Sequence, residues 1–290
     1  MLPWTLVALL SVTAQAPAVT GSYVPQRVFD TRQKNFSDFE TMLADLARAD
    51  AVFVGEQHDD PNTHRLELAI VEGLTRRGAP VVVALEMFER DVQESLDNYV
   101  AGTITEEQFL KESRPWPRYA TDYRPIIEFA RASKLPIVAS NVPRGVASDV
   151  GKTGLSAVES LGGDRRFAAR ELQCPVSGSY YDRFAAAMGN HAGASPNFYF
   201  AQCVKDETMG ESVADTFQKS TGHVAIVHFD GAFHSDFGEG TAESARRRMP
   251  GRRIAVVSIL PVTDLDSAKP AEPDLKRADY LLYTVGGKKQ

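Results

Sequence analysis

The stretch AVFVGEQHDDPNTH, residues 51–64, joins an apolar run to a polar turn and the start of a helix. Its apolar residues do not alternate with polar ones, which is typical of a strand buried on both faces. Asp60 is a suitable helix N-cap and Pro61 suits the first helical position. The stretch therefore predicts a buried strand, a polar turn and a helix that starts at residue 61.

The same alternation of strand and helix continues along the chain. Further apolar runs predict strands at residues 81–88, 136–140, 223–229 and 252–260. Helical patterns occupy residues 89–100, 105–113, 122–133 and 241–248. This order predicts an α/β fold with a central, mainly parallel sheet flanked by helices.

Two regions depart from that pattern. Residues 142–222 are rich in small and polar residues, with helices expected at 180–189 and 197–218, and predict a helical insertion or cap. Residues 266–290 read as a tail with a linker-like start and a short edge strand at 279–285. The α/β domain is accordingly expected to span residues 19–265.

The first 18 residues resemble a secretory signal peptide. They carry no charge, and their apolar run of about ten residues is too short to span a bilayer, which takes roughly 20 helical residues. Two A-x-A patterns follow that run. We expect an exported protein, periplasmic or extracellular, and no lipid anchor because no cysteine follows the run.

Composition narrows the function classes. The 290 residues have a net charge of −6, and the basic residues are dispersed, so nucleic-acid binding is not expected. The cysteines are Cys174 and Cys203. In an exported protein they can form a disulfide, but two unpaired core cysteines fit the sequence equally well.

Polar side chains follow four of the predicted strands, at the edge where parallel sheets bind ligands. These side chains are Glu56 and His58, then Glu86, then Asn141 and Arg144, and finally His228, Asp230 and His234. Each has a plainer alternative. Glu86 could cap a helix, His64 suits a structural or peripheral place in the first helical turn, and His228 could be a hydrogen-bonded core histidine.

Four of these residues form a candidate metal site: Glu56, His58, Glu86 and His234. Carboxylate and imidazole groups suit zinc, iron or manganese. The same four groups could instead perform acid–base catalysis without a metal. Their spacing in the sequence does not choose between these alternatives.

The segment WPRYATDYRP, residues 116–125, suggests haem. A tyrosine can bind haem iron, and arginines can pair with the propionates, which makes Tyr119, Tyr123 and Arg144 candidate haem-binding residues. Packing of these rings against the sheet is the alternative. By residue type, three tyrosines of the helical region are equally eligible: Tyr180, Tyr181 and Tyr199.

Several segments between residues 50 and 260 resemble the ChaN-like haem-binding uptake proteins, which are related to the Tiki proteases and erythromycin esterases. The matching segments are VFVGEQHDDPNTHRLELAIVEGL, VVVALEMFERDVQ, WPRYATDYRPIIEFARASKLPIVASNVPR, FYFAQCVKDETMGESVADTF and HFDGAFHSDFGEGTAESARRRMPGRRIAVVSI. The resemblance implies an exported bacterial haem or iron protein whose polar site contains Glu56, His58, Glu86, Gly231 and His234. It also implies a tyrosine haem ligand at a dimer contact, so the expected partners include a second copy and an outer-membrane uptake system.

Two active functions therefore compete. The first is haem or iron binding for uptake, and the second is a peptidase or esterase, metal-dependent or based on glutamate and histidine, that uses Glu56, His58, Glu86 and His234. An interaction protein with a vestigial polar cluster is a third alternative.

Overall fold

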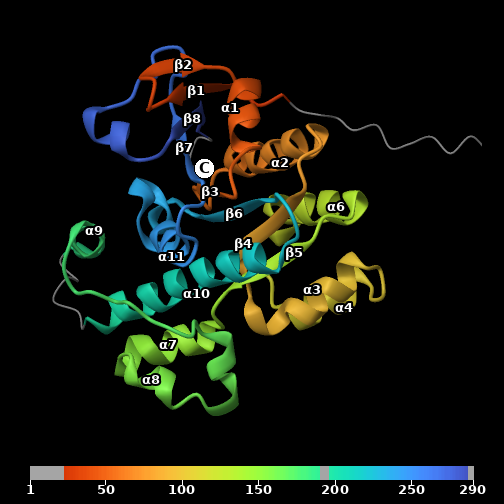
Figure 1. Cartoon of the computed structure of the whole chain (residues 1–290), viewed down its shortest axis with the longest axis vertical. Coiled ribbons are helices and arrows are strands. Elements are labelled where there is room, and N and C mark those ends of the chain that lie inside the picture. Colours follow the sequence, from red (N-terminus) through yellow and green to blue (C-terminus); the bar gives the residue numbers. More distant parts are fainter. Residues whose placement is uncertain (1–22, 190–195, 287–290) are drawn as a thin grey trace, which may run out of the picture.

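A mixed eight-stranded sheet forms the centre of the computed structural model, which describes residues 23–189 and 196–286 (Figure 1). The strand order is β2-β1-β8-β7-β3-β6-β4-β5. The strands are β1 (Gln26–Asp30), β2 (Asn35–Ser37), β3 (Ala51–Glu56), β4 (Val81–Glu89), β5 (Ile137–Asn141), β6 (Ala225–Gly231), β7 (Ile254–Val262) and β8 (Tyr280–Val285). The α/β fold and all five predicted core strands are confirmed. The predicted signal peptide lies outside the described residues.

The sheet differs from the expectation at one side. Strands β5, β4, β6, β3, β7 and β8 run parallel, whereas β1 pairs antiparallel with β8 and with β2. The strand predicted at 279–285 forms, but it is not an edge strand, because β1 continues the sheet beyond it. The strands β1 and β2 were not predicted, since both are short and mix polar with apolar residues.

Each helix predicted with bounds forms close to its predicted place. The helices are α1 (Phe39–Leu46), α2 (Pro61–Arg76), α3 (Gln93–Val100), α4 (Glu106–Ser113), α5 (Tyr119–Asp122), α6 (Arg124–Ser133), α7 (Arg144–Thr153), α8 (Ser156–Glu159), α9 (Ser179–Met188), α10 (Asn197–Lys219) and α11 (Gly240–Arg248). Of these, α1, α7 and α8 were not predicted individually. Short 3-10 turns include η4 (Ala232–His234). None of the helices within the described ranges is both long and apolar enough to cross a membrane.

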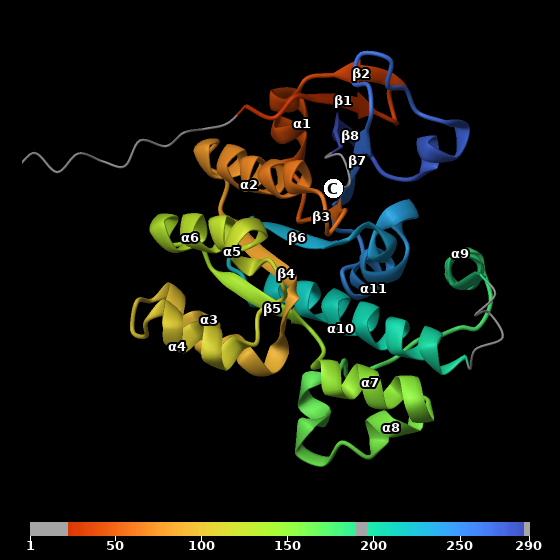
Figure 2. The same ribbon diagram turned by 180° about the vertical axis from the view of Figure 1, so that it is seen from behind.

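Strand pleating gives the sheet two apolar faces. Val52 and Val54 of β3 pack with residues of α1, α2 and α6, whereas Ala51 and Phe53 of the same strand pack with residues of α10 and α11. Successive side chains of a strand point to opposite faces, so a continuous apolar run satisfies both layers. Figure 2 shows α10 and α11 lying together on their side of the sheet.

The region predicted as a helical cap divides into two parts. The long helix α10 packs on β5, β6 and α11, and is therefore one of the covering layers of the sheet. Helices α7 and α8 lie beyond α10 and share a separate apolar cluster with it (Figure 1). Cys174 and Cys203 form a disulfide, with Cα atoms 5.7 Å apart, that ties the segment before α9 to α10.

Candidate functional site

The carboxyl ends of β3, β6 and β4 carry the polar residues, and the pleat divides them between the two faces of the sheet. Glu56 follows Val52 and Val54 by even steps, so it lies on the α2 face. Glu86 follows Val82 and Ala84, which pack on the α10 face. Glu56 and Glu86 therefore belong to two clusters, one on each face, and His58 lies between them, close enough for Glu86 and His234 to affect its pKa.

The first group, the Glu56 cluster, consists of Glu56, His58, His64, Glu67, Asp122 and Tyr123. Glu56 is buried, its Oε1 accepts a 2.9 Å hydrogen bond from the Tyr123 hydroxyl, and the same carboxylate contacts Nδ1 of His58. The His58 side chain is half-exposed and packs edge-on against Trp116. A carboxylate on one nitrogen of an accessible imidazole orients that ring for acid–base chemistry.

His64 occupies the centre of this cluster, on the first turn of α2. Its Nδ1 lies 3.0 Å from Oε2 of Glu67 and 3.6 Å from Oε2 of Glu56. Its Nε2 lies 3.1 Å from the carbonyl oxygen of His58 and 3.4 Å from Oδ2 of Asp122. The first-turn position predicted for His64 is correct, but the side chain is buried among carboxylates rather than peripheral.

The two glutamates of the cluster respond differently to burial. Burial raises the pKa of Glu67 well above its usual value, and the neighbouring Glu56 carboxylate raises it further. For Glu56, burial alone would raise the pKa, but the hydrogen bonds with His58 and Glu67 and the nearby His64 outweigh burial and lower it. Glu56 is therefore the ionised member of the pair, and Glu67 holds a proton unless a cation is close.

Gly231, at the end of β6, separates the two clusters. Its register partner on β3 is Glu56, and its backbone N–H donates a 2.8 Å hydrogen bond to Oε2 of Glu86. A Cβ atom at this position would lie 2.7 Å from Nε2 of His58. A side chain at this position would therefore displace the His58 ring from the backbone.

The second group, the Glu86 cluster, consists of Glu86, His234, Asp206, Tyr180 and Thr241. His234 of η4 has its Nε2 3.3 Å from Oε1 of Glu86 and its Nδ1 2.7 Å from Oδ1 of Asp206 on α10. Asp206 also accepts hydrogen bonds from the hydroxyls of Tyr180 and Thr241. A pocket of about 350 Å³, lined in part by Tyr180, Tyr199 and Asp206, opens beside this cluster.

Charged neighbours shift the pKa values of both His234 and Glu86, and His58 of the first cluster contributes to the shift of Glu86. Burial alone would lower the pKa of His234, but Glu86 and Asp206 outweigh it and raise that pKa well above its usual value. Burial alone would raise the pKa of Glu86, whereas His234 holds it well below its usual range. Nδ1 of His234 hydrogen-bonds to Asp206 and Nε2 forms an ion pair with Glu86, an arrangement that favours the charged form of the ring. The side-chain amide of Gln202 also lies within 3.1 Å of the ring nitrogens.

His228 and Asp230 belong to the core beneath these clusters. Both are fully buried, with Nδ1 of His228 3.3 Å from Oδ2 of Asp230, and Nε2 of His228 2.9 Å from the Ser140 hydroxyl. The Ser235 hydroxyl donates a 2.7 Å hydrogen bond to Asp230. His228 is therefore the hydrogen-bonded core histidine of the two alternatives raised by the sequence.

Comparison with known proteins now identifies the family. A family profile described as haem-binding uptake, Tiki superfamily, ChaN, matches residues 42–244, about 70% of the chain. The chain belongs to the ChaN-like haem-binding uptake family. A comparison with curated protein sequences finds no match.

One solved structure supports the same fold, and two others show a weaker likeness. ChaN of Campylobacter jejuni, described in terms of cofacial heme binding, has a TM-score of 0.65 and 20% sequence identity, covering 90% of this chain and 97% of that one. A mutant erythromycin esterase in its open conformation has a TM-score of 0.47 and 15% identity, covering 91% and 83%. A protein from Bacillus cereus has a TM-score of 0.49 and 12% identity, covering 84% and 90%.

Within this ChaN-like chain, the predicted haem-binding residues do not converge. The Tyr119 hydroxyl is buried, and its ring packs with Phe88 and Phe109. The Tyr123 hydroxyl is buried against Glu56. Arg144 begins α7 with a largely exposed side chain that pairs with Glu89 of β4 at 2.7 Å. Haem binding by these residues stays a prediction, and neither tyrosine hydroxyl reaches solvent in this conformation.

The sequence analysis missed three buried acids of the clusters: Glu67, Asp122 and Asp206. Glu67 had a detectable signal, because it shares the apolar stripe of α2 with Ile70 and Leu74 at helical spacing. A carboxylate on the buried face of a helix needs a partner. Asp206 had no comparable signal, since α10 is buried on several sides and carries polar residues throughout.

Proposed function

We propose that this ChaN-family chain binds haem and serves haem or iron uptake outside the cytoplasm. The observation that carries the proposal is the family match over residues 42–244. Haem requires an accessible iron ligand and an apolar surface for the macrocycle. Helix α9 and the start of α10 carry tyrosines and exposed apolar side chains, which support the proposal.

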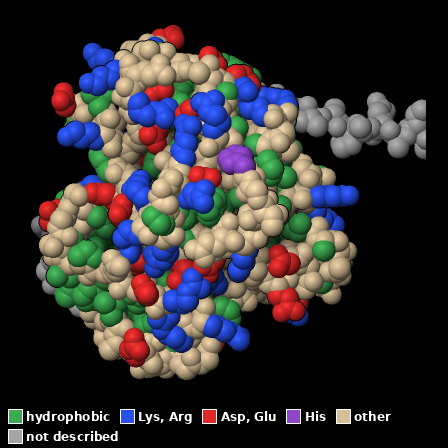
Figure 3. Space-filling model, in the orientation of Figure 1, with side chains coloured by type: hydrophobic (Ala, Val, Ile, Leu, Met, Phe, Trp, Pro, Cys, Tyr) green, Lys and Arg blue, Asp and Glu red, His purple; other side chains and the backbone are tan. Residues whose placement is uncertain are grey.

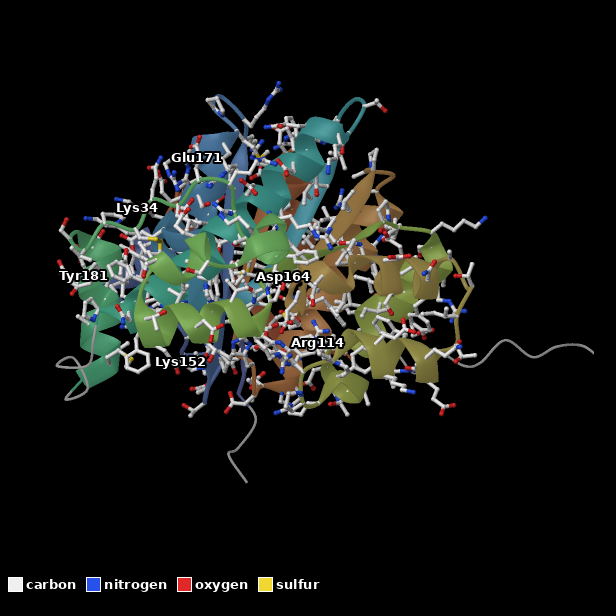
Figure 4. The ribbon with its side chains drawn as sticks, turned by 90° about the horizontal axis from the view of Figure 1, so that it is seen from below. Lys34, Arg114, Lys152, Asp164, Glu171 and Tyr181 are labelled. Carbon is white, nitrogen blue, oxygen red and sulfur yellow. A yellow bond between two sulfur atoms is a disulfide. The ribbon has the colours of Figure 1, made fainter. Side chains whose placement is uncertain are left out.

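Among the tyrosines considered as iron ligands, Tyr181 has the most suitable environment. The rings of Tyr119, Tyr123 and Tyr199 are at most 6% exposed. The Tyr180 hydroxyl is engaged by Asp206. Tyr181 is only half-buried, and its ring packs edge-on against Tyr199 at 4.9 Å. Figure 4 shows Tyr181 on α9, at the outer end of the molecule. We therefore propose Tyr181 as the haem ligand.

The surroundings of Tyr181 are apolar. Val176, just before α9, is 53% exposed, and Phe198, on the first turn of α10, is 49% exposed. On the face drawn in Figure 3, hydrophobic side chains gather over α9 and the start of α10, whereas acidic and basic side chains are interspersed elsewhere. Apolar patches of this kind mark binding surfaces. If haem binds face to face, as the description of Campylobacter jejuni ChaN states, two such surfaces would meet in a homodimer.

Haemin titration of the purified mature chain tests the proposal. We expect a saturating change of the Soret band at about one haem per chain, together with a shift toward the dimer in analytical ultracentrifugation. Tyr181→Phe should weaken binding by more than tenfold, while Tyr119→Phe, as the matched control, should not. A spectrum identical to free haemin at stoichiometric addition would refute haem binding. Undiminished binding by Tyr181→Phe would refute only the assigned ligand.

A further inference from the structure

The Glu56 cluster contains a group of side chains that the proposed haem site does not use. Glu56, His64 and Glu67 each direct one ligand-type atom to a common position, and these atoms lie within 4.8 Å of one another. All three residues are at most 3% exposed. They come from the end of β3 and from two successive turns of α2.

The contacts of His64 fix which of its nitrogens can accept a ligand. Its Nε2 faces the carbonyl oxygen of His58 at 3.1 Å and a carboxylate oxygen of Asp122 at 3.4 Å. Both are acceptors, so with a metal ion on Nδ1 the remaining proton of the ring would reside on Nε2. The lone pair of Nδ1 then points toward Glu67 and Glu56, which is the usual arrangement of a metal-binding histidine oriented by an acceptor on its other nitrogen.

The carboxylates supply a second, independent observation. Oε2 of Glu56 and Oε1 of Glu67 are buried and have no hydrogen-bond partner among the described residues. A buried carboxylate oxygen without a partner is costly, and two adjacent carboxylates repel each other. A positive ion between them and Nδ1 would satisfy all three groups at once.

The spacing suits a single ion. Nδ1 of His64 lies 3.0 Å from Oε2 of Glu67 and 3.6 Å from Oε2 of Glu56. Two ligands that are each about 2.1 Å from one ion are separated by about 3.0–3.4 Å in octahedral or tetrahedral geometry. We propose that Glu56, His64 and Glu67 bind one divalent first-row metal ion, such as manganese, iron or zinc.

This set differs from the four residues that the sequence predicted. Only Glu56 is shared, because the pleat carries Glu86 to the other face, where His234 has both nitrogens engaged by carboxylates. The ion would join the end of β3 to α2 and, through Asp122, to α5. The site is independent of haem binding at α9.

Metal analysis tests the site directly. The mature chain is dialysed against a chelator, incubated with Mn²⁺, Co²⁺ or Zn²⁺, desalted and analysed for metal by mass spectrometry. We expect about one ion per chain, and for Co²⁺ a d–d absorption without a thiolate charge-transfer band. His64→Ala and Glu67→Gln should lose the ion. His223→Ala, at a half-exposed histidine, and Glu72→Gln, on the outer part of the same helix, should retain it.

The His64→Ala and Glu67→Gln variants could lose the ion because they misfold. A further variant therefore keeps all three ligands and changes only a neighbouring residue. Asp122→Asn should lower the metal affinity by about 10–100-fold, because it weakens the group that orients His64. Failure of the wild-type chain to retain any of the three ions would overturn the proposal. Retention of one ion by a folded His64→Ala variant would do so as well. Haem binding is measured separately, so either proposal can fail alone.

Discussion

Glu56 ends β3 and Glu86 lies three residues before the end of β4, in the same parallel part of the sheet, but their side chains lie on opposite faces. β6 lies between the two strands, and its terminal Gly231 contacts both sides: its N–H bonds to Glu86, and His58 packs where its side chain would be. The polar residues at this edge therefore form two clusters with different chemistry. In the Glu56 cluster, one carboxylate oxygen each of Glu56 and Glu67 is buried without a hydrogen-bond partner among the described residues, whereas in the Glu86 cluster His234 pairs with two carboxylates.

Substitution of Gly231 should disturb both clusters. In Gly231→Ala the new methyl group would lie 2.7 Å from Nε2 of His58, so the ring must move away from Glu56. We expect a loss of about 1–3 kcal/mol in the free energy of unfolding, measured by chemical denaturation. Gly145→Ala is the matched control, because nothing lies within 4 Å of its added Cβ. Equal stability of the two variants would contradict the proposed close approach.

The ion pair between His234 and Glu86 predicts a pH dependence. The pKa of His234 is raised in the folded state, so its stabilisation is fully present below the unfolded pKa of about 6.5 and is lost as pH rises through the folded value. Glu86→Gln removes one of the two carboxylates that raise this pKa, and the loss should then begin at lower pH. Unfolding measured from pH 5 to 9 checks this, and His234→Gln should abolish the pH-dependent contribution. An unshifted profile in Glu86→Gln would refute the coupling.

Two tyrosines test the difference between a bonded and an unbonded buried hydroxyl. Tyr123→Phe removes the 2.9 Å hydrogen bond to Glu56 and should cost about 1 kcal/mol of unfolding free energy. Tyr119→Phe should cost nothing or stabilise, because its buried hydroxyl has no partner among the described residues. Chemical denaturation of both variants gives the comparison. A larger loss of stability in Tyr119→Phe than in Tyr123→Phe would contradict the prediction.

The disulfide should contribute strongly to the stability of the helical region. Cys174 and Cys203 are 29 residues apart, and a cross-link of that span stabilises by about 2–4 kcal/mol through the entropy of the unfolded chain. Reduction of the wild-type chain should lower the unfolding free energy by this amount, as measured by denaturation with and without a reductant. The double variant Cys174→Ala, Cys203→Ala should show no response to the reductant. A stability unaffected by reduction would rule out this contribution.

The sequence by itself determined the layered fold. Continuous apolar runs, such as residues 51–55, specify strands buried on both faces, and the Asp60–Pro61 pair specifies where α2 begins. These signals depend only on residues that are neighbours in the chain, so they can be recognised in a single sequence. The short strands β1 and β2 were not predicted because their stability comes from pairing, β1 with β8 and β2 with β1, rather than from their own sequence pattern.

Only the tertiary structure decided which polar residues meet. The sequence placed Glu56, His58, Glu86 and His234 at one edge of the sheet, but the face that each side chain takes depends on strand register and pleat. His64, Glu67 and Asp206 join the clusters because helices α2 and α10 pack on opposite faces beside those strand ends. Contacts between distant segments follow from packing, and local sequence patterns do not encode them.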